Sequence, residues 1–131
     1  MARIMVDLLY GMNLIEVQVL IDADRSSIVG AHVCATEESM IDLLEQAWGG
    51  ILFIDEAYAL VKSDSPNDFG QEAIDVLIKA MEDYREDIVV IMAGYASDME
   101  RLFESERRLL FPYAVHLCIF GIYCTMKLSK L

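Results

Sequence analysis

Two apolar runs, "ILFID" at 51–55 and "DIVVIMAGY" at 87–95, constrain the fold of this chain more than any other feature. Neither run alternates polar with apolar residues, and such continuity is typical of strands buried on both faces of a parallel sheet. An amphipathic stretch at 70–85 lies between them, with apolar residues recurring every three or four positions. Alternation of helices with buried strands predicts an α/β fold, a three-layer αβα domain around a parallel sheet.

The same periodicity places the remaining elements. Two further strands are expected at "LIEVQVLIDA" (14–23) and "YAVHLCIF" (113–120), the latter as the last buried strand of the sheet. Further helices are expected at 2–12, 36–48 and 96–109, and "DRSSIVG" is a turn or a short helical segment. Candidate N-caps are Thr36 for the second of these helices and Ser97 or Asp98 for the third.

Composition excludes several classes of function. The chain has 131 residues, enough for one domain, and 22 acidic against 10 basic side chains give a net charge of −12. Such a charge repels nucleic acid and anionic membranes, so neither is expected as a partner. No apolar run reaches the roughly 18 residues of a membrane span. The three cysteines have no disulfide or zinc spacing, which favours free thiols in the cytoplasm.

Two carboxylates, Asp55 and Glu56, directly follow the first apolar run. Ligands of open parallel sheets bind at the carboxyl ends of the strands. Four apolar residues and then Asp-Glu form the Walker B pattern of P-loop ATPases, in which Asp55 would hold Mg²⁺ through water. Glu56 would polarise the water that attacks the γ-phosphate of ATP. An acidic pair that only caps a helix start is the alternative, and the pattern alone leaves both open.

The surroundings of this pair resemble one family. "GGILFIDEAYAL" and "DFGQEAIDVLIKAMEDYREDIVVIMAGY" are similar to the AAA+ ATPases related to stage V sporulation protein K and red-type Rubisco activase, the CbbX or CfxQ group. The likeness covers roughly residues 2 to 105. It implies a P-loop NTPase (AAA+) core that binds ATP and Mg²⁺, assembles as a homo-oligomeric ring, hexameric in relatives, and remodels a protein substrate.

The resemblance also implies roles for individual residues. Glu56 corresponds to the catalytic residue, Asp55 and Glu56 to nucleotide-binding residues, and Asp55 to the Mg²⁺ ligand. Tyr95 lies near the strand end where many AAA+ proteins place a polar sensor, and both phosphate sensing and simple packing remain open. His32 and Val33 fall in the loop that grips a threaded polypeptide, where relatives carry an aromatic residue; the alternative for His32 is an exposed loop position.

Three departures from the family pattern bear on activity. The Gly-rich P-loop and the strand before it would precede Ala2 and are not in this sequence, which leaves a sheet edge without its partner. Leu110 stands at the arginine-finger position, and Arg107 and Arg108 are out of register with it. The helical lid does not follow His116.

These departures divide the chain into a partial AAA+ core at 1–120, with its Walker B strand near 51–56, and a divergent hydrophobic tail at 121–131. We therefore expect little or no ATP hydrolysis by this chain alone. Two alternatives stay open: a non-catalytic, truncated interaction or assembly module, and an assembly in which another chain supplies the strand and the loop.

Overall fold

A five-stranded sheet organises the chain, in the order β1-β2-β3-β5-β4. The computed structural model describes residues 2–29, 35–61, 69–84, 86–109, 114–119 and 122–127. The strands are β1 (Leu20–Ala23), β2 (Ile51–Ile54), β3 (Val89–Tyr95), β4 (Ala114–Ile119) and β5 (Ile122–Lys127). β1, β2 and β3 pair in parallel, so the predicted α/β fold with a parallel sheet is confirmed.

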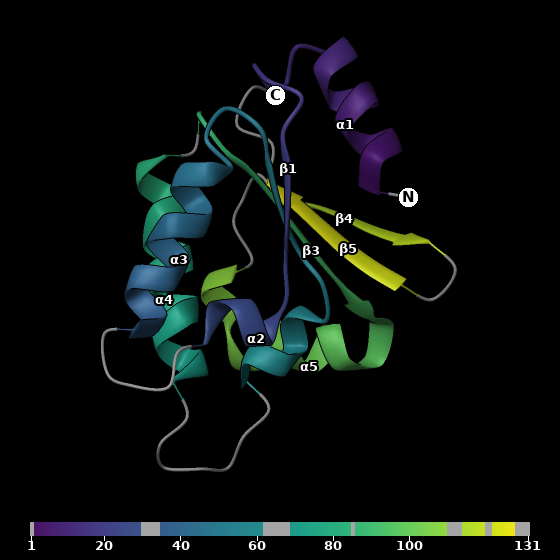
Figure 1. Cartoon of the computed structure of the whole chain (residues 1–131). Helices are drawn as coiled ribbons and strands as arrows, with labels where there is room; N and C mark the ends of the chain where they lie inside the picture. Colours follow the sequence, from purple (N-terminus) through teal and green to yellow (C-terminus); the bar gives the residue numbers. More distant parts are fainter. Residues whose placement is uncertain are drawn as a thin grey trace.

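Helices lie on both faces of this sheet. Figure 1 shows α3 and α4 side by side on one face and α1 on the opposite face. The helical segments are α1 (Ala2–Gly11), α2 (Arg25–Ile28), α3 (Ala35–Gln46), the 3-10 turn η1 (Ala57–Val61), α4 (Gly70–Asp83), α5 (Ala96–Ser105) and the 3-10 turn η2 (Arg107–Leu109). In the described part of the chain, none of the helices is long and apolar enough to cross a bilayer.

The helix starts differ from the predicted caps. α3 already begins at Ala35, so Thr36 lies inside its first turn and is fully buried instead of capping it. α5 begins at Ala96 behind Tyr95, which supplies no side-chain cap, so Ser97 and Asp98 are first-turn residues. The predicted range 36–48 thus began one residue late and the range 96–109 began at the observed residue, but both cap assignments were wrong, because cap preferences do not fix a boundary to the residue.

Two hydrophobic cores sandwich β2 and β3. The larger lies between the sheet and α3, α4 and α5, and it receives Leu52, Ile54, Val90 and Met92 from the strands. The smaller lies under α1, where Val6 and Leu9 pack with Ile51, Val89 and Ile91. Successive strand residues thus enter opposite cores, which is why the two runs are apolar throughout.

The C-terminal strands contradict one prediction. Within the predicted strand 113–120, the described part, β4, is not a further parallel strand: it is antiparallel to β5 and lies outermost. β5, within the segment predicted as a tail, pairs antiparallel with β3 from Ile91↔Met126 to Tyr95↔Ile122. β5 therefore occupies the edge of β3 that was expected to lack a partner. Apolar composition predicts burial but not direction, and the two residues between β4 and β5 allow only a hairpin.

Candidate functional site

The carboxyl ends of β1 and β2 bring two acidic segments together. Asp24 follows β1, and Asp55 with Glu56 follows β2. The Asp55 backbone N–H donates to the Ala23 carbonyl oxygen at 2.9 Å, which extends the pairing one residue beyond β2. All three acidic side chains are exposed. The structure thus places them at the sheet edge where α/β proteins bind ligands.

The turn after β2 has an uncommon backbone conformation. Glu56 has φ +48°, in the left-handed region that non-glycine residues seldom adopt. Its N–H donates to Oδ1 of Asp55 at 2.9 Å, and its carbonyl accepts from the Ala59 N–H at 2.8 Å at the start of η1. One oxygen of Asp55 is therefore held by the turn itself. Backbone strain of this kind clusters at functional sites.

A hollow of about 560 Å³ opens between α2 and the segment after β2. Its walls are Asp24, Arg25, Ser26, Val29, Asp55, Glu56 and Ala59. The lining therefore combines three carboxylates with one guanidinium. Tyr95, at the end of β3, is not part of it.

The first residue of α2 and the N-cap before it fix the geometry of this hollow. Asp24 caps the helix, since its Oδ1 accepts from the Ser26 hydroxyl at 2.6 Å and the Ser27 N–H at 2.9 Å. These hydrogen bonds, with that from Ser26 the strongest influence, lower the pKa of Asp24 and keep it ionised. Arg25 donates from Nη1 to the Ala59 carbonyl and so ties α2 to η1.

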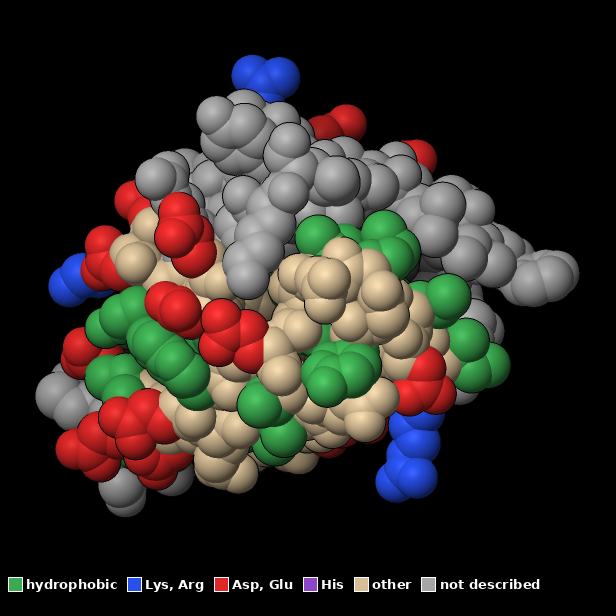
Figure 2. Space-filling view, turned by 90° about the horizontal axis from the view of Figure 1, so that it is seen from above, with side chains coloured by type: hydrophobic (Ala, Val, Ile, Leu, Met, Phe, Trp, Pro, Cys, Tyr) green, Lys and Arg blue, Asp and Glu red, His purple; other side chains and the backbone are tan. Residues whose placement is uncertain are grey.

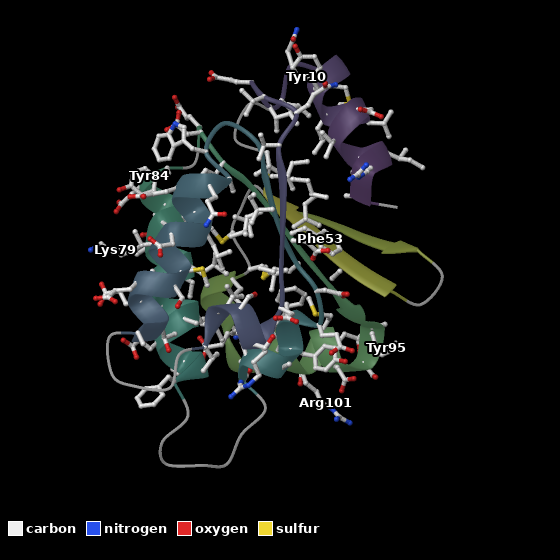
Figure 3. The ribbon with its side chains drawn as sticks, viewed as in Figure 1. Tyr10, Phe53, Lys79, Tyr84, Tyr95 and Arg101 are labelled. Carbon is white, nitrogen blue, oxygen red and sulfur yellow. The ribbon has the colours of Figure 1, made fainter. Side chains whose placement is uncertain are left out.

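Tyr58 in η1 couples the acidic turn to the end of β3. Burial first, and then the Glu56 carboxylate, raise the pKa of this phenol. A Cβ at Gly94 would lie 2.8 Å from Cδ1 of Tyr58 and 2.8 Å from Sδ of Met99, so only glycine lets η1 and α5 pack this closely on β3. Tyr95 itself is 61% exposed and lies near α5 (Figure 3).

The predicted site residues do not all lie at one place. Asp55 and Glu56 line the hollow, whereas Tyr95 lies at a neighbouring strand end outside it, and their roles stay predictions. His32, Val33 and Leu110 fall outside the described residues. Asp24 and Arg25 were missed, although the strand-end rule that selected Asp55 applies equally to "LIDAD". Nothing in the sequence signalled the contact of Tyr58 with Gly94.

The donor set suits Mg²⁺ better than it suits phosphate. Mg²⁺ takes oxygen ligands and keeps several waters, so one or two carboxylates are enough protein ligands. Among the described residues no group of three His, Cys, Asp or Glu side chains could enclose a metal. A polyanion would meet three carboxylates, and the described lining does not favour it.

Sequence comparison identifies the family of proteins to which this chain belongs. Residues 2–112 match the ATPase family associated with various cellular activities (AAA), and the chain belongs to this family. The protein CfxQ homolog of Trieres chinensis is 37% identical over 129 residues, 97% of this chain and 44% of that protein. The chloroplastic ribulose bisphosphate carboxylase/oxygenase activase of Cyanidioschyzon merolae is 40% identical over 116 residues, 88% of this chain and 40% of its own length.

A bacterial relative has the same extent of similarity. Stage V sporulation protein K of Bacillus subtilis is 36% identical over 131 residues, 98% of this chain and 40% of that protein. The chain thus spans less than half the length of these relatives. The predicted kinship with the CbbX or CfxQ group and with stage V sporulation protein K is confirmed.

Proposed function

We propose that Asp55 and Glu56 are the Mg²⁺-binding and water-activating residues of an ATP-hydrolysing site. One observation carries this proposal: both exposed carboxylates stand at the carboxyl end of β2 and line a hollow of about 560 Å³ in an AAA-family chain. Mg²⁺, when bound with ATP, neutralises the charge that develops on the phosphates. Asp55 would hold the ion through an oxygen not engaged by the turn, and Glu56 would accept a proton from the attacking water.

We further propose that hydrolysis remodels a partner protein within a homo-oligomeric ring. Relatives named for the activation of ribulose bisphosphate carboxylase/oxygenase and for sporulation support a protein substrate, without indicating which one. The lack of a disulfide or zinc spacing among the three cysteines supports a cytoplasmic setting. Tyr95 as a phosphate sensor and His32 with Val33 as substrate-gripping residues belong to the same proposal.

Residues 1–131 on their own are proposed to hydrolyse little or no ATP. They contain no Gly-rich loop that ends in Gly-Lys-Thr or Gly-Lys-Ser. The described hollow offers three carboxylates, and Arg25 within it is bound to the Ala59 carbonyl. This arrangement also favours the second candidate, a non-catalytic module that keeps the assembly surfaces of the family.

A chimera tests the two carboxylate roles. Residues 2–112 would replace the matching segment of Bacillus subtilis stage V sporulation protein K, so that the remainder of that protein is present. Glu56→Gln should reduce ATP turnover about 100-fold or more while ATP still binds. Asp55→Ala should weaken Mg²⁺-dependent binding of a fluorescent ATP analogue. Glu100→Gln, an exposed α5 carboxylate, is the control and should change neither.

The isolated chain tests the second claim. We expect the isolated chain to bind the same analogue, with Mg²⁺, with a dissociation constant of about 1 mM or higher. Micromolar binding that Asp55→Ala weakens would refute the claim that residues 1–131 are insufficient. Unchanged turnover in the Glu56→Gln chimera would refute the catalytic assignment.

A further inference from the structure

A second hollow lies between α3 and α4, on the face of the sheet opposite α1. It has a volume of about 290 Å³ and forms a groove between the two helices. The α3 side and the turn after it contribute Glu37, Ile41, Leu44, Glu45 and Trp48, and the α4 side contributes Val76, Lys79, Ala80, Asp83 and Tyr84. None of these residues lines the acidic hollow around Asp55 and Glu56, so the groove is a separate feature.

Large apolar side chains are left open to solvent in this groove. Trp48 is 47% exposed, Tyr84 43% and Ile41 42%. The rings of Trp48 and Tyr84 meet edge to face with centroids 5.1 Å apart, so each holds the other in place. Rigid aromatic side chains that remain accessible beside an apolar groove are typical anchors of protein–protein interfaces.

Carboxylates surround these apolar side chains. Glu37, Glu45 and Asp83 line the groove, and none of them forms an ion pair with any residue that the structure describes. Further exposed acidic residues on the same two helices are Glu38, Asp42, Asp75 and Glu82. In Figure 2 hydrophobic side chains lie among acidic ones on the side of the molecule that α3 and α4 form. Lys79 is the single cation among the described residues of the lining.

We propose that this groove binds an amphipathic helix of a partner protein whose apolar stripe is flanked by Lys and Arg. The lining of α3 extends from Glu37 to Glu45, a rise of about 12 Å, which matches roughly two turns of a docked helix, and Trp48 lies just beyond it. The stripe would cover Trp48 and Tyr84, and the basic flanks would meet the acidic rim. A second copy of this chain, with its net charge of −12, fits poorly.

The groove and the acidic hollow lie toward opposite ends of the sheet. Trp48 and Tyr84 precede the amino ends of β2 and β3, whereas Asp55 and Glu56 follow the carboxyl end of β2. A helix docked at the aromatic end of the groove therefore leaves the hollow open. The inference does not depend on nucleotide chemistry, so it stands or falls separately from the proposed ATPase site.

Trp48 is the only tryptophan of the chain and reports directly on the groove. The probe is a synthetic helical peptide of about 14 residues, four turns, with a Leu stripe flanked by Lys and Arg and without Trp. The matched control peptide carries Glu in place of every Lys and Arg. We expect the basic peptide to shift the Trp48 emission in a saturable way, and the acidic peptide to leave it unchanged.

Two charge-reversal variants separate the rim from the net charge. Glu45→Lys with Asp83→Lys alters the groove, and Glu100→Lys with Glu104→Lys makes the same change of charge on exposed α5 positions. We expect the groove pair to weaken binding about tenfold or more and the α5 pair to weaken it no more than about twofold. Binding to the Trp48→Ala variant is measured by the fluorescence anisotropy of a labelled basic peptide. We expect this variant to bind the peptide about tenfold more weakly.

Four results would overturn the proposal. They are the absence of saturable binding by the basic peptide, equal binding of the acidic peptide, an equal loss in both double variants, and self-association in sedimentation that Trp48→Ala abolishes. Circular dichroism and urea midpoints of every variant guard against misfolding. Trp48 and the four acidic positions are exposed, so their replacement should leave the fold intact.

Discussion

Substitution of Gly70 by Ala tests how tightly α4 and η1 pack. Helix propensity alone predicts stabilisation by up to about 1 kcal/mol, because alanine restricts the unfolded chain. The structure predicts the opposite sign. A Cβ at Gly70 would overlap the carbonyl oxygen of Leu60 and lie 2.9 Å from its carbonyl carbon, and Nη1 of Arg25 is 3.1 Å away.

The magnitude follows from these contacts. The overlap with the Leu60 carbonyl oxygen sets the movement, because atoms in ordinary contact lie more than about 3 Å apart, so the backbone at Leu60 must move by about 1 Å or more. Overpacking of this kind costs about 1–3 kcal/mol, and the gain in helix propensity offsets part of it. We therefore expect Gly70→Ala to lower the free energy of unfolding by about 1–2 kcal/mol.

Urea unfolding followed by Trp48 fluorescence measures this change. Gly11→Ala is the matched control: Gly11 ends α1, and a Cβ there has no neighbour within 4 Å. That variant should be as stable as the wild type or more stable, by up to about 1 kcal/mol. If Gly70→Ala is also stabilising, α4 does not pack against η1 as closely as described, and the position of Arg25 beside Gly70 is wrong as well.

Three further outcomes are expected. Leu77→Ala empties a fully buried α4 position and should cost about 2–5 kcal/mol in the same urea assay, so a loss below about 1 kcal/mol would contradict its place in the core. Hydrogen bonds from Ser26 and Ser27 lower the pKa of Asp24, so its charge adds stability above the unfolded value of 3.8. The advantage of the wild type over Asp24→Asn should vanish as the pH falls through the lower folded pKa, and a pH-independent advantage would be inconsistent with this. Burial and the Glu56 carboxylate raise the pKa of Tyr58, so Glu56→Gln should lower this pKa toward 10.0 in a tyrosine NMR titration. An unchanged pKa would contradict an interaction between the Glu56 carboxylate and the Tyr58 phenol.

The parallel strands β2 and β3 and the helix between them could be predicted from local sequence patterns. The uninterrupted apolar runs predict β2 and β3 because residues on both of their faces are buried, and the periodicity of 70–85 predicts α4 with its buried Leu77. The cap residues were less well predicted, since α5 begins behind Tyr95, which makes no side-chain cap hydrogen bond. The direction of β4 is a property of its connection to β5, which hydrophobicity does not encode.

The candidate site also contains residues that the sequence predicts and residues that it does not. Asp55 and Glu56 could be predicted because a buried strand and its first polar residues are adjacent in sequence. Arg25 reaches the Ala59 carbonyl across 34 positions, and Tyr58 packs on Gly94 from another element. Such contacts arise only when the sheet brings distant segments together, so they could not be predicted from any local sequence pattern.

The antiparallel pairing of β3 with β5 has a consequence for the synthesis of the chain. Val89–Met92 pair with β2, whereas Ile91–Tyr95 pair on the other side with 122–126, which are translated later. Until residues 122–126 have been translated, β5 cannot cover the backbone hydrogen-bonding groups on this side of β3. A nascent chain in this state is a target for wrong pairing and for chaperones. Pairing with β5 is therefore the step that covers this edge of β3.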